Sequence, residues 1–207
     1  MKSIPNLYTF RHNSAHTRGF AWASSIVPRS EMINRVCTDC GLVDNYPSGA
    51  FDVIIERGVK YPDVLGCGAY PFLIVSAVVV SAWLEVGIDS FHTHPVGIHK
   101  VQSERLKSTD APLYFRIEID GRCEIDLIAS GIKFIRICKT CQRVIEQPML
   151  AAERRYIMVE SSWDGSAVFR DFLRYPRVSF CNQAVVDIAS KYRFTNFRFD
   201  LMAAQRS

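Results

Sequence analysis

The feature that most constrains this chain is a pair of short cysteine motifs. Cys37 and Cys40 are separated by two residues, and Cys138 and Cys141 repeat that spacing much farther along the chain. Two intervening residues let the backbone fold into a tight knuckle that directs both sulfurs toward one point, and four thiolates complete the tetrahedral sphere of a zinc ion. The spacing therefore predicts one structural zinc site made by Cys37, Cys40, Cys138 and Cys141.

The separation of the two motifs limits the architecture. Residues 41–137 lie between the two pairs, and a compact zinc ribbon has far fewer residues between its knuckles. We therefore expect a split zinc ribbon, with knuckles near residues 37–41 and 138–142, that carries a large insertion or belongs to a larger sheet. The alternative is two unrelated cysteine pairs that are buried or redox-active.

The chain length suits one sizeable core or two small ones, and we predict a single zinc-stapled domain over residues 1–207. Apolar residues make up 48% of the chain, which excludes disorder as its main state. The amino terminus lacks the apolar stretch of a signal peptide, and the longest nearly apolar run, residues 69–84, is shorter than the ~20 residues of a transmembrane helix. We therefore expect a cytoplasmic protein without a membrane partner, whose seven cysteines are thiols or metal ligands.

Two segments share one pattern, which predicts a repeated unit. Residues 71–96 and 176–200 each begin at a proline and suggest a strand, a helix and a second strand. Ser76 and Asn182 stand where a side-chain oxygen can cap the helix start. The valines of the first helix predict burial nearly all round, although the same run is also compatible with a strand. We therefore predict an α+β fold, with a mixed or antiparallel sheet and two strand–helix–strand repeats; chance similarity of the two segments is the alternative.

Alternating apolar and charged residues on both sides of residues 120–121 predict a β-hairpin. A three-residue loop at 119–121 would pair Ile117 with Cys123 and keep the apolar side chains on one face. Cys123 then belongs to the buried face and is not a metal ligand. Cys67 lies between two glycines; it is a possible fifth ligand, but a small apolar residue packed at a tight bend is favoured.

His92, His94 and His99 form the histidine cluster of the chain. On a strand, His92 and His94 share a face that could hold a metal, while two exposed histidines are the ordinary alternative. The chain has no glycine-rich phosphate loop, nucleophile elbow or His-Glu-x-x-His helix, and four cysteines would close the coordination sphere of a zinc ion. These residues favour a zinc-stabilised interaction protein over an enzyme.

With these features, the sequence resembles the bacterial double-CXXCG motif family. The resemblance covers roughly residues 37–199 and rests on the segments Cys37-Thr-Asp-Cys40-Gly41, 61–76, 91–96, 112–117, 138–141, 163–170 and 195–196. It implies an immunity protein that binds and neutralises one antibacterial polymorphic toxin domain in the cytoplasm. Gln142 departs from the family pattern, which has glycine after the second pair. A left-handed backbone there costs a non-glycine residue about 1 kcal/mol, so the second knuckle would be strained or would hold the metal less tightly, and the four-cysteine site stays open.

Two other functions stay open. A zinc-ribbon nucleic-acid-binding regulatory module would need a concentrated basic face, whereas the net charge of +4 is dispersed along the chain, which disfavours nucleic acid as a partner. A metal-dependent or thiol-redox enzyme would need an incomplete metal sphere or an exposed cysteine of low pKa. The oligomeric state and the identity of a toxin are not encoded in any recognisable motif.

Overall fold

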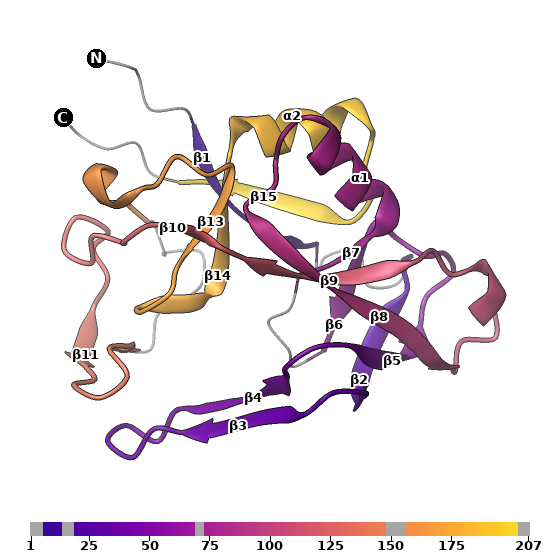
Figure 1. Ribbon diagram of the computed structural model, residues 1–207, viewed down its shortest axis with the longest axis horizontal. Coiled ribbons are helices and arrows are strands. Elements are labelled where there is room, and N and C mark those ends of the chain that lie inside the picture. Colours follow the sequence, from indigo (N-terminus) through magenta and orange to yellow (C-terminus); the bar gives the residue numbers. More distant parts are fainter. Residues whose placement is uncertain (1–5, 14–18, 69–72, 148–155, 203–207) are drawn as a thin grey trace.

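Strands dominate the computed structural model shown in Figure 1, which describes residues 6–13, 19–68, 73–147 and 156–202. Six strands form a closed barrel. Their order around the barrel is β2 (Trp22–Pro28), β5 (Phe51–Arg57), β8 (Phe91–Val101), β9 (Tyr114–Ile119), β7 (Leu73–Ser76) and β6 (Val64–Cys67). β6 returns to pair with β2 in parallel, which closes the barrel.

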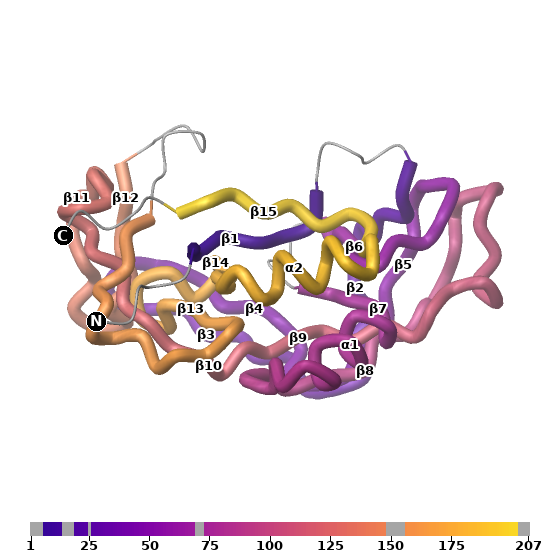
Figure 2. The backbone as a smooth tube through the Cα atoms, turned by 90° about the horizontal axis from the view of Figure 1, so that it is seen from above, coloured from indigo at the N-terminus to yellow at the C-terminus, as the bar shows by residue number. Residues whose placement is uncertain are grey.

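A second, five-stranded sheet lies beside the barrel. Its order is β10 (Gly121–Arg122), β13 (Val168–Asp171), β14 (Tyr175–Asn182), β1 (Leu7–His12) and β15 (Phe197–Leu201). Two helices, α1 (Ala77–Glu85) and α2 (Gln183–Lys191), lie side by side in Figures 1 and 2. Short 3-10 turns occur at Ser108–Asp110 and Glu160–Ser162.

Two separate ribbons complete the described structure. The first ribbon is β3 (Met32–Val36) with β4 (Val43–Pro47), and the second ribbon is β11 (Phe134–Ile137) with β12 (Val144–Glu146). Each is an antiparallel pair that belongs to neither the barrel nor the five-stranded sheet. Both project from the body of the molecule in Figure 1, the first along its lower edge.

Strand periodicity explains the barrel core. Along β5, Phe51, Val53 and Ile55 are fully buried, because alternate side chains of a strand point to the same face and that face lines the barrel interior. The interior also contains Cys67 and Tyr114, whose hydroxyl donates to the Pro62 carbonyl at 2.6 Å. The expectation that Cys67 packs as a small apolar residue is confirmed.

The five-stranded sheet is buried on both faces. Adjacent residues of β13 and of β14 point to opposite faces. Val168 and Cys181 pack toward the helices, whereas Phe169 and Phe180 pack on the other face. The cluster beneath the helices includes Trp83 of α1 and also takes residues from the barrel strands. Barrel, sheet and helices therefore share one apolar layer.

The predicted α+β fold with two strand–helix–strand repeats at 71–96 and 176–200 is wrong. The described chain is mostly strand, with two α-helices and a closed six-stranded barrel. α1 joins two barrel strands and α2 joins two strands of the other sheet, so the two segments serve different sheets. Local patterns indicated helices and strands, but strand partners are set by contacts between distant residues, which periodicity does not encode.

The helices themselves fall where the sequence pattern placed them, with two differences. The α2 cap is as expected, since the Asn182 side chain accepts a hydrogen bond from the Ala184 N–H at 3.1 Å. Ser76 precedes α1 but donates its hydroxyl to Asp63 at 3.2 Å instead of capping. The expected all-round burial of α1 is wrong, because Val78 and Leu84 are more than half exposed.

The predicted hairpin at residues 119–121 is also wrong. β9 pairs with β7 on one edge and with β8 on the other, so neither edge is open to the residues that follow it. The chain leaves the barrel, and Gly121 and Arg122 pair in parallel with β13 of the second sheet. Cys123 is buried as expected, but within the apolar cluster on the far face of that sheet.

Among the described residues, no helix combines the length and apolar character that crossing a membrane requires.

Candidate metal centre

Each ribbon ends in a knuckle with the same backbone hydrogen bonds. In the first, the Cys37 N–H donates to the Leu42 carbonyl at 2.9 Å and the Gly41 N–H donates to the Cys37 carbonyl at 2.8 Å. In the second, the Cys138 N–H donates to the Arg143 carbonyl and the Gln142 N–H to the Cys138 carbonyl, both at 2.9 Å. The two knuckles therefore share one turn geometry.

The two knuckles face each other, and their sulfurs converge. Cys37 Sγ lies 3.6 Å from Cys138 Sγ, and Cys40 Sγ lies 3.6 Å from Cys141 Sγ. All four sulfurs lie within 4.8 Å of one another. A tetrahedral ion with metal–sulfur bonds of about 2.3 Å would separate its ligands by about 3.8 Å, so the four predicted ligands lie together as a possible site for one metal ion.

The residue after each second cysteine has a left-handed backbone. Gly41 has φ of 70°, and Gln142 in the second knuckle has φ of 60°. The departure from glycine at Gln142 therefore falls on a conformation that costs a side chain about 1 kcal/mol. Its amide Nε2 donates to the Lys139 carbonyl at 2.9 Å, which offsets part of that strain.

Asp39, inside the first knuckle, links the two knuckles. Its carboxylate accepts hydrogen bonds from the Cys138 thiol at 3.1 Å and from Arg136 Nη1 at 3.1 Å, and these contacts lower its pKa. Arg136 Nη2 also donates to the Asp39 carbonyl at 3.0 Å. Arg136, on the strand that precedes the second knuckle, thus binds the backbone of the first knuckle.

The thiols are electrostatically unequal without a metal. Backbone N–H groups of Cys40 and Asp39 lower the pKa of Cys37 to about 6. The backbone N–H of Cys141 lowers the pKa of Cys138, but burial and the hydrogen bond to Asp39 together raise it to about 12. Because metal ligation requires thiolates, metal binding would release the proton from Cys138.

Three further arginines hold the first ribbon in place. Arg143 pairs with Asp44 at 2.5 Å, and Arg177 of β14 donates to the Val43 carbonyl at 2.9 Å. Arg116 of the barrel strand β9 donates to the carbonyls of Pro47 at 2.8 Å and Ser48 at 3.3 Å. The first ribbon is therefore tied to the second ribbon, the sheet and the barrel by polar contacts.

Sequence reasoning missed these arginine contacts. One signal was present: acidic residues lie in and after the first motif (Asp39, Asp44), and arginines flank the second (Arg136, Arg143). Opposite charge around two motifs that share a metal is consistent with direct pairing. The barrel and sheet arginines carried no such signal, because their contacts join strands far apart in the sequence.

The histidines lie away from the cysteine centre. His94 Nε2 is 2.7 Å from a Glu118 oxygen across the β8–β9 pair, and His92 Nε2 is 3.2 Å from an oxygen of Asp120, which follows β9. His99 is exposed. In the part of the chain that the structure describes, the four cysteines are the one group with three or more convergent metal ligands. The alternative of a histidine metal site thus has no cluster to support it there.

The chain matches no protein-family model, and no curated protein sequence matches it significantly. The resemblance to the double-CXXCG motif family therefore rests on the motifs themselves and stays a prediction.

Proposed function

We propose that the protein is a cytoplasmic immunity protein, which binds and neutralises one antibacterial toxin domain without catalysis. Two lines support the proposal. One is the resemblance of its motifs to the double-CXXCG family, and the other is the form of the metal centre and its ribbons.

Zinc is the ion that suits this centre best. Four thiolates at near-tetrahedral spacing are the common ligand set of structural zinc. Four protein ligands also leave no open position for water or substrate, which a catalytic zinc needs. The zinc would thus have a structural role, which is to fasten the two ribbons to each other.

The observation that carries a binding role is the exposure of large apolar side chains on these ribbons. They are Val36, Val43, Phe134, Ile135 and Ile137, of which Ile135 is 65% exposed. A short ribbon that presents apolar groups to solvent loses stability unless something else holds it, and here the metal and the arginines do so. Apolar side chains inside a polar, arginine-containing surround are typical of surfaces that bind proteins. A toxin domain would cover them.

The proposal is tested by co-expression with each candidate toxin domain from the neighbouring genes. The cognate domain should co-purify with the protein at one to one, and protection of toxin-exposed cells should titrate with the amount of immunity protein. Ile135→Glu should weaken the complex, because it places a charge within the apolar contact. Ile128→Glu is the matched control, since Ile128 is 88% exposed but lies outside both ribbons.

Failure would take one of two forms. No neighbouring domain forms a complex, or catalytic amounts of the protein protect fully. Either result would contradict stoichiometric neutralisation. Equal weakening by both glutamate variants would show that the ribbons are not the contact surface.

A further inference from the structure

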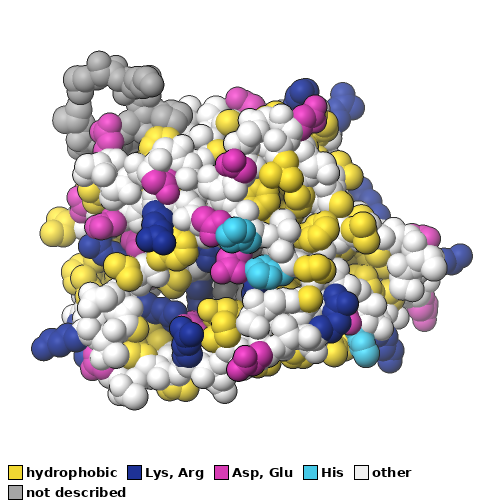
Figure 3. Space-filling view, in the orientation of Figure 1, with side chains coloured by type: hydrophobic (Ala, Val, Ile, Leu, Met, Phe, Trp, Pro, Cys, Tyr) yellow, Lys and Arg dark blue, Asp and Glu magenta, His cyan; other side chains and the backbone are white. Residues whose placement is uncertain are grey.

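A cleft of about 380 Å³ lies where the first ribbon, the barrel and the five-stranded sheet meet. Figure 3 shows a hollow above the lower ribbon, with Lys and Arg side chains beside it. The charged side chains that line the cleft are Arg35, Arg116, Arg143, Arg170, Arg177, Asp44 and Glu118. Five arginines against two carboxylates leave an excess of three positive charges. We call this cavity the arginine cleft.

Three of these arginines already have a structural task. Arg116, Arg143 and Arg177 hold the first ribbon through the contacts described above. Arg116 also lies 3.4 Å from a Glu118 oxygen. The cleft is therefore built from rigidly placed guanidinium groups, and the remaining two arginines, Arg35 and Arg170, decide what else it can hold.

Arg170 is the most informative of the five. Its Nε atom is buried and has no hydrogen-bond partner among the described residues. Its other contacts are weak: Nη1 lies 3.4 Å from the Pro176 carbonyl, and the guanidinium lies 5.5 Å from the centre of the Phe172 ring. Burial lowers the pKa of Arg170. Arg170 is half-buried, and the carboxylates of Glu118 and Asp120 act on it electrostatically, but neither of them accepts a hydrogen bond from the buried Nε. A buried donor without an acceptor is costly, and an oxyanion in the cleft would supply that acceptor.

Arg35 supplies a second charge from a different element. It is exposed on β3 and lines the cleft from the ribbon side, whereas Arg170 lies on β13 of the sheet. Guanidinium groups bind phosphate and carboxylate oxygens with paired hydrogen bonds, which a single ammonium group does not provide. Two arginines from two sides of one cavity are suited to a ligand with several such oxygens.

We propose that the arginine cleft is a binding site for a multiply charged oxyanion, phosphate or carboxylate, held chiefly by Arg170 and Arg35. Its volume falls in the range of small-molecule sites. The same oxygens are carried by a free phosphorylated compound and by an acidic segment of another protein, and the test separates these sources. This inference does not depend on the immunity role.

The test is calorimetric titration of the full, zinc-loaded chain at low ionic strength with two probes. One probe is inorganic pyrophosphate and the other is a hexaglutamate peptide. At least one should bind saturably at one site per chain. Arg170→Gln should raise its Kd about tenfold, because charge-assisted hydrogen bonds are lost. Arg35→Gln should act in the same direction, and it changes an exposed side chain.

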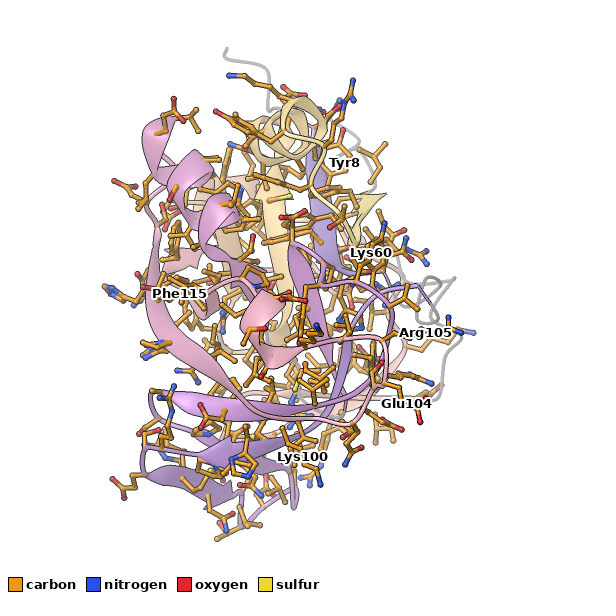
Figure 4. All side chains as sticks on the ribbon, turned by 90° about the vertical axis from the view of Figure 1, so that its right-hand side faces the viewer. Tyr8, Lys60, Lys100, Glu104, Arg105 and Phe115 are labelled. Atoms are coloured by element: carbon orange, nitrogen blue, oxygen red, sulfur yellow. The ribbon has the colours of Figure 1, made fainter. Side chains whose placement is uncertain are left out.

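Arg105→Gln is the matched control. It removes the same charge from an arginine that does not line the cleft and lies at the outer edge of the molecule in Figure 4. Saturable binding of pyrophosphate alone identifies a free phosphate ligand, and binding of the peptide alone identifies an acidic protein segment; both support the site.

Three results would overturn the proposal. Neither probe binds saturably; or Arg105→Gln weakens binding as much as the cleft variants, which would show only general charge attraction; or Arg35→Gln and Arg170→Gln leave the Kd unchanged. If Arg170→Gln does not fold, as shown by lost circular dichroism, Arg35→Gln alone decides the outcome.

Discussion

The barrel and the two ribbons are stabilised in different ways. Inside the barrel, Phe51, Val53 and Ile55 have no exposed surface. In the second ribbon every residue of β11 is exposed, and the first ribbon adds no residue to any of the three apolar clusters. The barrel depends on apolar burial, whereas the ribbons depend mainly on four cysteines and a few arginines, with Val144 of the second ribbon packed against one apolar cluster.

Because of this difference, loss of the metal should affect the ribbons and the barrel differently. Burial of apolar surface contributes roughly 25 cal/mol per Å² to the free energy of folding. The buried core of the barrel therefore stabilises it without a metal. A two-stranded ribbon is marginal on its own. Loss of the metal should therefore release the ribbons and leave the barrel folded.

The largest effect is expected from removal of a metal ligand. Cys138→Ser should abolish tight metal binding, which is worth about 10 kcal/mol or more in small zinc domains. Amides of both ribbons should then exchange rapidly with solvent while barrel amides stay protected, as measured by hydrogen exchange. Cys123→Ser is the control, since Cys123 is buried in a core cluster and its change should leave the metal bound. Equal metal loss in both variants would refute the ligand assignment.

A substitution in the apolar core tests the other half of the comparison. Trp83→Ala should lower the free energy of unfolding by about 3–5 kcal/mol, because it leaves a cavity in the apolar layer that barrel and sheet share. The metal content should remain unchanged. Val78→Ala on the same helix, where Val78 is 57% exposed, should have little effect in urea unfolding. Metal loss in Trp83→Ala would show that ribbons and core are one cooperative unit.

A smaller effect is expected around the metal ligands. Arg136→Gln should weaken metal affinity about tenfold, because it removes the contacts that orient Asp39 across the two knuckles. Competition with a coloured chelator measures the change. Arg35→Gln, at the equivalent position of the first ribbon, should leave the metal affinity unaltered. A similar loss in both would point to general charge and not to the Asp39 contact.

The smallest effect concerns the left-handed residues. Gln142→Gly should tighten metal binding by up to about 1 kcal/mol through relief of backbone strain. Gly41→Gln should weaken it by a similar amount, and only through its φ of 70°, since a Cβ there meets nothing within 4 Å. The same chelator competition checks this pair. A shift in the same direction for both substitutions would contradict the strain argument.

Features set by local sequence could be predicted better than features set by contacts between distant residues. The four cysteines could be found because ligand type and spacing are short-range signals, and Asn182 because a helix cap is local. The barrel could not be found, since nothing near β9 in the sequence indicates that β7 and β8 occupy both of its edges. Because pairing between distant residues leaves no local signal, the prediction of a hairpin at residues 119–121 was wrong and the arginine contacts of the cleft were not predicted.

Metal content and thiol counting together test the central claim, that one zinc on Cys37, Cys40, Cys138 and Cys141 fastens the two ribbons. The account predicts one zinc per folded chain. It also predicts four thiols that become reactive when a chelator removes the zinc and three more, at Cys67, Cys123 and Cys181, that react only after unfolding. Burial raises the pKa of these three and keeps them protonated. Folded protein purified without metal, with the four knuckle thiols freely reactive, would contradict it.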